Sequence, residues 1–341
     1  IEEVQVLLRG YVRTCISRNN QKQRQLDSLL SSRECLWTRG IVYPSPGTHS
    51  LTMPFSLELP ESVPPSFDIS YPGVDATIRY FVEIIGVRPG ALRTNFRSQH
   101  PLAVVSPDPV GAQVRTGLRS GWNGPWKVIT ENKRIRRGFW GEFADVSVEL
   151  AFPLVPALPL HTQIPFRISV STLSKTLDSD DGKEIWPVPP MHPEKVHFKL
   201  KRRVHVKAGM WSQYSVQDVS RLGGMGRSHG AVEICESQCQ WVPLAKSSKG
   251  KWRQRKTFRS SFRLSCPPTF TNYLVKNEYF LYIEVPFSGF LNNLCSIVPV
   301  TISSGKMPRR AADQIVVPSH LWPDWEQIDL PRKRKYALSF A

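Results

Sequence analysis

The sequence predicts an all-β protein built from two tandem immunoglobulin-like β-sandwiches. Its 341 residues exceed the usual size of one compact core, which favours two domains. Its 29 prolines argue against long helices, because proline interrupts the helical hydrogen-bond pattern. Apolar and polar residues alternate along many short segments, which is typical of half-buried strands.

The first part of the chain consists of predicted strands and turns. Residues 1–16, "IEEVQVLLRGYVRTCI", alternate and predict a strand, whereas the polar residues 17–33 suit either a loop or a short helix. Residues 35–60 predict two strands around the turn signal "YPSPGTH". Residues 76–87, "ATIRYFVEIIGV", are largely apolar on both faces, so we expect a central strand. "HPLAVVSPDP" then closes the unit with a short strand.

The second part resumes the alternation after a segment of different composition. Residues 111–143 are rich in glycine and basic residues, and we interpret them as the connection between domains. Strands are predicted from Asp145 onwards, including residues 194–208, and residues 208–231 are interpreted as a long flexible loop. The predicted organisation is an N-terminal sandwich at 1–110, a linker at 111–143, a C-terminal sandwich at 144–305 and a basic tail at 306–341.

A double proline occurs twice in a similar setting, as "SVPPSF" (62–67) and "SCPPTF" (265–270). Each follows an alternating strand and leads through a polar loop to another strand. Because proline cannot donate to a β-ladder, each double proline ends a strand or lies at an exposed edge. We interpret the match as a duplicated β unit; the alternative is a chance likeness of two proline-rich turns. The match pairs Pro65 with Pro268, Phe67 with Phe270 and Glu83 with Glu284.

These residues resemble arrestin-like proteins, particularly fungal alpha-arrestins. The resemblance lies in "GTHSLTMPFSLELPESVPPSF" followed by "IRYFVEI", and more weakly in the second copy, entered through "DVSVELAFPLVPALPLHTQIPFRISVSTLS". It covers about residues 1–305. It implies two β-sandwiches without a catalytic centre, acting as a cytosolic adaptor for membrane-protein cargo in endocytosis, trafficking or ubiquitin-linked regulation.

The chain departs from this family in one respect. Alpha-arrestins often recruit HECT-type ubiquitin ligases through a PPxY peptide that binds WW domains. Here the double prolines continue as "PPSF", "PPMH" and "PPTF", and no PPxY is present. Recruitment of a ubiquitin ligase is therefore unsupported by these residues.

The formal net charge of +17 predicts an anionic partner. The expected partners are phosphorylated cargo tails and anionic lipid headgroups, with nucleic acid ranked below them. Two strands carry basic residues at alternate positions, which project from one side of a sheet and can bind phosphates. If these strands are neighbours, they form one cationic face; the alternative is a solvated outer surface. The candidate residues are Lys199, Lys201, Arg203, His205 and Lys207 in the first stripe, and Lys249, Lys251, Arg253 and Arg255 in the second.

Arg202 interrupts the first stripe because it falls on the apolar face of its strand. We favour a β-bulge that turns the side chain outward. The alternative is a buried ion pair between the layers of the sandwich, and the sequence does not identify its acidic partner.

Aromatic and basic residues alternate within residues 111–143, in a pattern suited to stacking on nucleic acid and neutralising its charge. We favour packing of the tryptophans at a domain interface. The alternative function is a nuclear or nucleic-acid-associated binding protein, with "PRKRK" at 331–335 as a nuclear signal. The cluster comprises Trp122, Trp126, Phe139, Trp140, Lys133, Arg134, Arg136 and Arg137.

The remaining motifs predict neither a metal site nor an enzyme. Six scattered cysteines favour reduced thiols in a cytosolic or nuclear protein, and Cys235 and Cys239 lack the second ligand pair of a zinc site. No catalytic arrangement stands out, so we expect no enzymatic activity and no cofactor. No apolar run is long enough to span a bilayer, and we expect a cytoplasmic protein peripheral to the plasma membrane or endosomes. The strand pattern begins at Ile1, so we also expect sequence upstream of it.

Overall fold

The computed structural model describes residues 1–44, 46–47, 50–90, 93–178, 185–245, 247–289 and 291–307. They belong to one compact unit, Ile1–Met307. Strands dominate this unit, which confirms the predicted all-β class. The helices within the described ranges are α1 (Pro109–Arg119) and the 3-10 helix η1 (Pro193–Lys195). Apart from residues 306 and 307, the predicted basic tail, with "PRKRK", lies outside the described residues.

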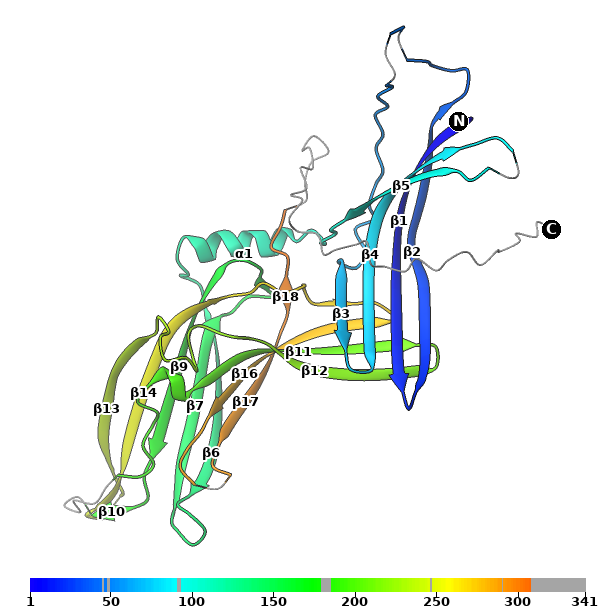
Figure 1. Cartoon of the computed structure of the whole chain (residues 1–341). Helices are drawn as coiled ribbons and strands as arrows, with labels where there is room; N and C mark the ends of the chain where they lie inside the picture. Colours follow the sequence, from blue (N-terminus) through cyan, green and yellow to red (C-terminus); the bar gives the residue numbers. More distant parts are fainter. Residues whose placement is uncertain are drawn as a thin grey trace. The chain divides into compact units, whose positions relative to one another are not determined.

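Three antiparallel sheets, named A, B and C below, form the fold (Figure 1). Sheet A has the order β2 (Gln21–Thr38), β1 (Glu3–Arg18), β4 (Val74–Val87) and β3 (Phe67–Tyr71), with β5 (Phe96–Leu102) also on β4. Sheet B has the order β10 (Leu177–Asp178), β14 (Lys249–Arg263), β9 (Gln163–Leu173), β7 (Phe143–Pro153) and β6 (Trp126–Arg136), with β13 (Glu233–Pro243) on β14. Sheet C has the order β12 (Trp211–Arg221), β11 (His197–Ala208), β16 (Val275–Val285) and β15 (Phe270–Thr271), with β17 (Leu294–Val300) on β16. The short strands β8 (Leu158–Pro159) and β18 (Ile302–Ser303) pair in parallel.

Two polar segments that were not predicted as strands form edge strands. Residues 17–33, expected as a loop or short helix, lie mostly in β2, which pairs with β1 along its length. The expected flexible loop at 208–231 contains β12, which pairs with β11. No side chain of either strand is fully buried. These strands therefore lack the alternation of apolar and polar residues by which a strand is recognised in a sequence.

The strands expected within residues 35–60 are largely absent. β2 ends at Thr38, and the described residues from 41 to 66 belong to no strand. Pro44, Pro46, Pro54 and Pro60 remove backbone donors throughout this segment, which opposes a continuous ladder. The central position expected for residues 76–87 is confirmed, because β4 pairs with β1 on one side and with β3 and β5 on the other.

Residues 111–143, expected as a linker, contain regular structure. Helix α1 begins after Asp108, whose carboxylate accepts a hydrogen bond of 2.9 Å from the Gly111 N–H. β6 pairs with β7 over its whole length and forms one edge of sheet B. Leu118 of α1 and Ile135 of β6 are buried in the core between sheets B and C. This segment therefore contributes directly to a hydrophobic core.

Two hydrophobic cores share sheet C. Sheet B packs on one part of it, where the rings of Phe166 and Phe198 lie 4.9 Å apart between their centroids. Sheet A packs on the other part, where Val12 and Ile78 belong to the same buried cluster as Val206. The residues expected as an N-terminal sandwich thus contribute one sheet, and its buried face lies on sheet C.

Sheets A and C have the same strand order. In each sheet a hairpin, β1–β2 or β11–β12, lies along one edge of the central strand, which is β4 or β16. Two further strands, β3 and β5 or β15 and β17, pair with the other edge of that central strand. This agreement supports the duplication inferred from the double prolines. The duplicated unit is a five-stranded sheet rather than a complete sandwich.

The double prolines occupy equivalent places in the two sheets. The buried Tyr80 on β4 donates its hydroxyl hydrogen to the carbonyl oxygen of Pro64 at 2.7 Å. The buried Tyr279 on β16 donates in the same way to Pro267 at 2.8 Å. Each tyrosine therefore fixes the proline turn against the central strand and satisfies a carbonyl that the turn would leave unpaired.

The residue after each double proline is also equivalent in its bonding. Ser66 donates its N–H to the Val104 oxygen at 2.8 Å, and its hydroxyl accepts from the Val104 N–H at 2.9 Å. Thr269 makes the same two bonds to Ile302, at 2.8 and 2.9 Å. Both copies thus hold the chain that leaves their last strand.

The structural register corrects one part of the sequence match. Phe67 and Phe270 are equivalent, because each begins a strand and pairs with the residue two positions before the buried tyrosine. Phe67 pairs with Ile78, before Tyr80, and Phe270 pairs with Asn277, before Tyr279. Glu83 follows its tyrosine by three residues, however, and Glu284 follows Tyr279 by five. The predicted pairing of Glu83 with Glu284 is therefore wrong. The two glutamates have similar neighbours in the sequence, but they occupy different register positions in their strands. Tyr282 occupies the position equivalent to Glu83.

Candidate functional site

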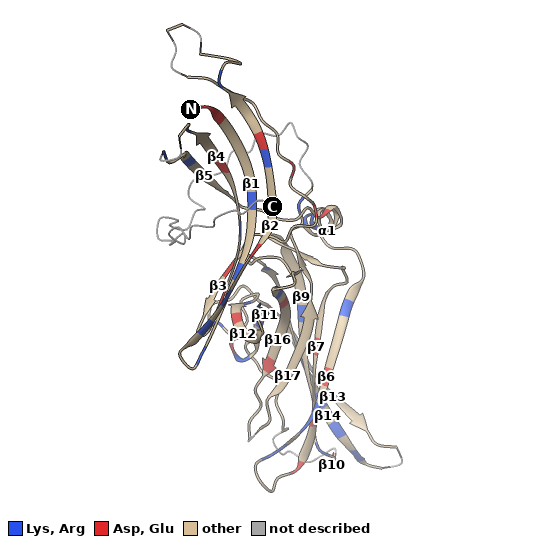
Figure 2. Cartoon of the chain, turned by 90° about the vertical axis from the view of Figure 1, so that its right-hand side faces the viewer, with Lys and Arg blue, Asp and Glu red and all other residues tan. Residues whose placement is uncertain are grey.

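The two predicted basic stripes lie on different sheets. The first is on β11 in sheet C, and the second is on β14 in sheet B. The two strands are not neighbours. They therefore do not form the single cationic face that was predicted for adjacent strands. Their apolar faces, with Phe198 and Phe258, are buried in the core between these sheets, so the stripes point to opposite sides. Figure 2 shows lysine and arginine positions spread over all three sheets.

Three basic residues of the stripe on β11 are paired with carboxylates, which offset part of its charge. Lys199 lies 2.7 Å and Lys201 3.5 Å from the carboxylate oxygens of Asp218 on β12. Arg203 lies 2.8 Å from Glu278 on β16. The hydrogen bond from Lys199 is the main cause that lowers the pKa of Asp218 below its ordinary value. These three basic residues are therefore engaged within sheet C.

His205 and Lys207 complete this stripe. The His205 ring stacks on Tyr214 at 4.2 Å between centroids. Burial, followed by the nearby charges of Lys207 and Lys276, lowers the pKa of His205 below its ordinary value of 6.5. His205 is consequently uncharged at neutral pH and supplies no positive charge to an anion. Lys207, next to the last residue of the strand, is exposed.

The Asp218 pair gives a testable pH dependence. A carboxylate with a lowered folded-state pKa stabilises the fold above its unfolded value, ordinarily 3.8, and this stabilisation is lost as the pH falls through the folded-state pKa. We expect Asp218→Asn to reduce the free energy of unfolding at neutral pH by less than about 1 kcal/mol, because the pair is exposed to solvent. Urea unfolding at a series of pH values should show the two proteins converging in acid. A difference that widens below the ordinary value would contradict this assignment.

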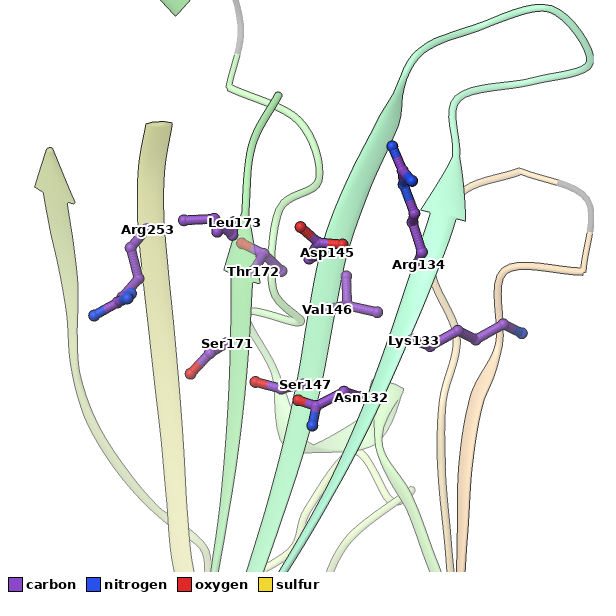
Figure 3. Close-up of a pocket in the computed structure, with 10 residues that line it drawn as sticks. All are labelled: Asn132, Lys133, Arg134, Asp145, Val146, Ser147, Ser171, Thr172, Leu173 and Arg253. Atoms are coloured by element: carbon purple, nitrogen blue, oxygen red, sulfur yellow. The ribbon is translucent and has the colours of Figure 1, made fainter. Parts of the chain in front are cut away.

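The outer face of sheet B forms a more open basic surface. Strands β6, β7, β9 and β14 lie side by side, and a shallow hollow of about 390 Å³ runs across them (Figure 3). One register row holds Arg134, Asp145, Leu173 and Arg253. The next row holds Asn132, Ser147, Ser171 and Arg255. The first row thus has arginines at both ends with Asp145 and Leu173 between them, and the second places hydroxyl and amide groups beside it.

Positive charge exceeds negative charge on this face. Lys251 pairs with Asp145 at 3.8 Å. Arg167 and Arg255 both pair with Glu149, at 3.2 and 3.5 Å. These carboxylates therefore offset only part of the basic charge contributed by β9 and β14.

Two arginines of the hollow remain available for an external anion. The Arg134 guanidinium lies 4.6 Å from the centroid of the Phe143 ring, a contact that leaves its charge uncompensated. Arg253 is exposed and has no ion pair within the part of the chain that the structure describes. Lys249, at the exposed start of β14, likewise has none there. Of the predicted second stripe, Arg253 is therefore the residue best placed to bind a ligand.

Several residues of the hollow were not predicted as a site. Asn132 and Arg134 lie on β6, within the segment expected as a linker, and Ser147 and Ser171 come from two further strands. The alternation in "WKVITENKRIR" would have indicated β6. No local pattern indicates that these strands lie beside β14.

Arg202 points inward, so the favoured prediction of an outward turn is wrong. A bulge does occur in the pairing of β11 with β12, but its extra residue, Val219, lies on β12. The alternation of β11 is therefore unbroken, and Arg202 stays on the same face as the buried residues Leu200 and Val204.

Aromatic rings surround the Arg202 guanidinium at the junction of the two cores. It donates a hydrogen bond to the Tyr71 hydroxyl and lies 5.5 Å from the centroid of that ring and 5.9 Å from that of Phe67. No acidic partner for it is found within the described ranges, where its contacts are with aromatic residues, so the alternative of a buried ion pair is not observed either. Interactions with ring faces offset part of the cost of removing this charge from water.

The predicted aromatic cluster is divided between the core and the surface. Trp122 packs against the core between sheets B and C, which is not the interface between two domains that the favoured interpretation expects. Trp126 is 41% exposed, however, and Phe139 and Trp140 are 77% and 88% exposed. The packing interpretation is wrong for the last two, because they lie in the turn between β6 and β7, beyond the paired residues.

The described residues show no group of three or more histidine, cysteine or acidic side chains that could hold a metal ion. Cys235 and Cys239 both lie on β13, and all six cysteines are unpaired. No helix in the described ranges is long and apolar enough to cross a membrane. Models of known protein families do not match this chain, and no curated protein sequence matches it significantly.

Proposed function

We propose that the protein is a non-enzymatic adaptor that binds a phosphorylated cytosolic segment of a membrane protein on the outer face of sheet B. The observation that carries this proposal is the hollow with Arg134 and Arg253 at its ends. Arginine suits phosphate because its planar guanidinium donates two parallel hydrogen bonds. The resemblance of the double-proline segments to arrestin-like proteins agrees with an adaptor role in cargo trafficking, at the cytoplasmic surface of the plasma membrane or endosomes.

The spacing of the hollow favours an extended peptide with two phosphates. Arg134 on β6 and Arg253 on β14 are separated by three strand intervals, or about 14 Å at the usual strand spacing. An extended chain covers this distance in roughly four residues. Ser147, Ser171 and Asn132 lie in the register row next to that of the arginines, and their hydroxyl and amide groups can bond to the peptide backbone.

A peptide with two phosphoserines four residues apart tests the proposal directly. We expect the protein to bind it more tightly than the unphosphorylated peptide, as measured by fluorescence anisotropy. The double variant Arg134→Glu/Arg253→Glu should weaken binding roughly a hundredfold, because two charge-assisted contacts are lost. Lys22→Glu/Arg24→Glu is the matched control, since it changes net charge equally on exposed positions of β2.

The controls separate a specific site from general attraction. Equal weakening by both double variants would show that the overall charge of +17, and not the hollow, attracts the peptide. Unchanged binding in Arg134→Glu/Arg253→Glu would also exclude this site. A nucleic-acid-binding protein would instead bind DNA of any sequence and lose affinity steeply with salt, and that result would support the alternative function.

A further inference from the structure

The turn between β6 and β7 presents two adjacent aromatic side chains to solvent. Phe139 and Trp140 are the most exposed aromatic residues in the part of the chain that the structure describes, and their ring centroids lie 6.2 Å apart. Neither belongs to a buried cluster of the fold. Removing large aromatic side chains from water lowers the free energy. The tip is therefore suited to bind a partner with an apolar interior.

The tip is flanked by positive charge. The segment 133–143 carries basic residues at four positions and a single acidic residue, Glu142. Glu142 is itself paired with Lys175 at 2.5 Å. The basic positions are Lys133, Arg134, Arg136 and Arg137.

The tip is also held in place by a neighbouring loop. The Asn292 side chain donates to the Arg136 carbonyl oxygen at 2.8 Å, and Lys133 donates to the Leu291 carbonyl oxygen at 2.7 Å. Within the turn, Arg136 Nε donates to the Gly141 oxygen at 2.9 Å. Leu291 in that loop is itself strongly exposed. The aromatic residues are thus presented by a supported hairpin.

We propose that the β6–β7 tip, through Phe139 and Trp140, docks on an anionic lipid bilayer. Tryptophan and phenylalanine insert at the boundary between headgroups and acyl chains, while flanking arginines bind anionic headgroups. The two aromatic residues occupy the end of a hairpin, a convex shape that enters a bilayer surface without a matching groove. This proposal does not rest on phosphopeptide binding. It would, however, bring the hollow, which begins at Arg134, close to a membrane from which cargo tails emerge.

Co-sedimentation with lipid vesicles tests the tip. We expect the protein to bind phosphatidylcholine–phosphatidylserine vesicles at physiological ionic strength and to bind phosphatidylcholine vesicles more weakly. Phe139→Ser/Trp140→Ser should lower the partition coefficient by roughly tenfold or more, because each side chain loses its apolar burial. Met210→Ser is the matched control, since Met210 is an exposed apolar residue in a different hairpin turn.

Further variants distinguish insertion from charge and from misfolding. Arg136→Glu/Arg137→Glu should weaken binding more than the β2 reversal Lys22→Glu/Arg24→Glu. Brominated lipids should quench tryptophan fluorescence of the wild type and should quench Trp140→Phe less. Binding by the Ser double variant at the wild-type level would overturn the proposal, as would equal losses in Met210→Ser. The Ser double variant should unfold in urea at the wild-type midpoint, which shows that it is folded whether or not the hollow binds a phosphopeptide.

Discussion

Truncating Tyr279 to alanine is expected to lower the free energy of unfolding by about 3–5 kcal/mol, the usual cost of removing a large buried aromatic side chain. Tyr279 is 1% exposed and lies in the core between sheets B and C. Burial raises the pKa of its phenol, so the hydroxyl remains a neutral donor to the Pro267 carbonyl oxygen. Its oxygen also accepts a hydrogen bond from the Asn277 amide at 3.1 Å.

Removing the hydroxyl alone isolates its role at the proline turn. We expect Tyr279→Phe to cost about 1–3 kcal/mol, because it leaves a buried carbonyl and a buried amide without this partner. Tyr80→Phe should behave similarly, since Tyr80 makes the equivalent bond to Pro64. Tyr214→Phe on an exposed strand is the control and should change little. Denaturant unfolding of the three variants measures the difference, and equal effects in all three would exclude a specific role for the proline turns.

Phe67 is expected to couple sheet A to sheet C. Its ring is 3% exposed and lies 5.0 Å from that of Phe270 between centroids, in an edge-to-face arrangement. Phe67→Ala should cost about 3–5 kcal/mol, and Phe270→Ala less, because Phe270 is only half-buried. The double variant should be less destabilised than the sum of the single ones by about 0.5–1.5 kcal/mol, the energy of the lost ring pair.

A distant pair provides the control for this double-mutant cycle. Phe258 lies in the core between sheets B and C, whereas Phe67 lies in the core between sheets A and C. The effects of Phe67→Ala and Phe258→Ala should therefore add. Additive effects for the Phe67 and Phe270 pair as well would contradict the packing of sheet A on sheet C.

Alternation along the chain was sufficient to predict the class of the fold and its buried strands. β4 was assigned correctly because apolar residues lie on both its faces, and only a central strand buries both. β2 and β12 were missed for the converse reason, since an edge strand with polar faces resembles a loop. Prolines had opposite effects: they indicated the duplicated turns, but between residues 41 and 60 they prevented the strands that hydropathy suggested.

The candidate site was less accessible to prediction than the fold. A period of two reveals which side chains share a face of a strand, but it does not reveal which strands are neighbours. The basic residues of β11 and β14 were therefore assigned to their outer faces correctly, while their separation onto different sheets required the tertiary structure. The neutralisation of Lys199 by Asp218 depends on pairing across a hairpin with a bulge, which the sequence does not indicate.

The duplicated sheet also has a symmetry consequence. Phe67 and Phe270 hold the same position in their own sheets, and these two residues contact each other. Val12 and Val204, which are likewise equivalent by register, lie in the same buried cluster. Contact between identical positions is the property of an isologous interface, such as that of a twofold homodimer. The contact between sheets A and C therefore has the organisation of a dimer whose two subunits have been joined into one polypeptide.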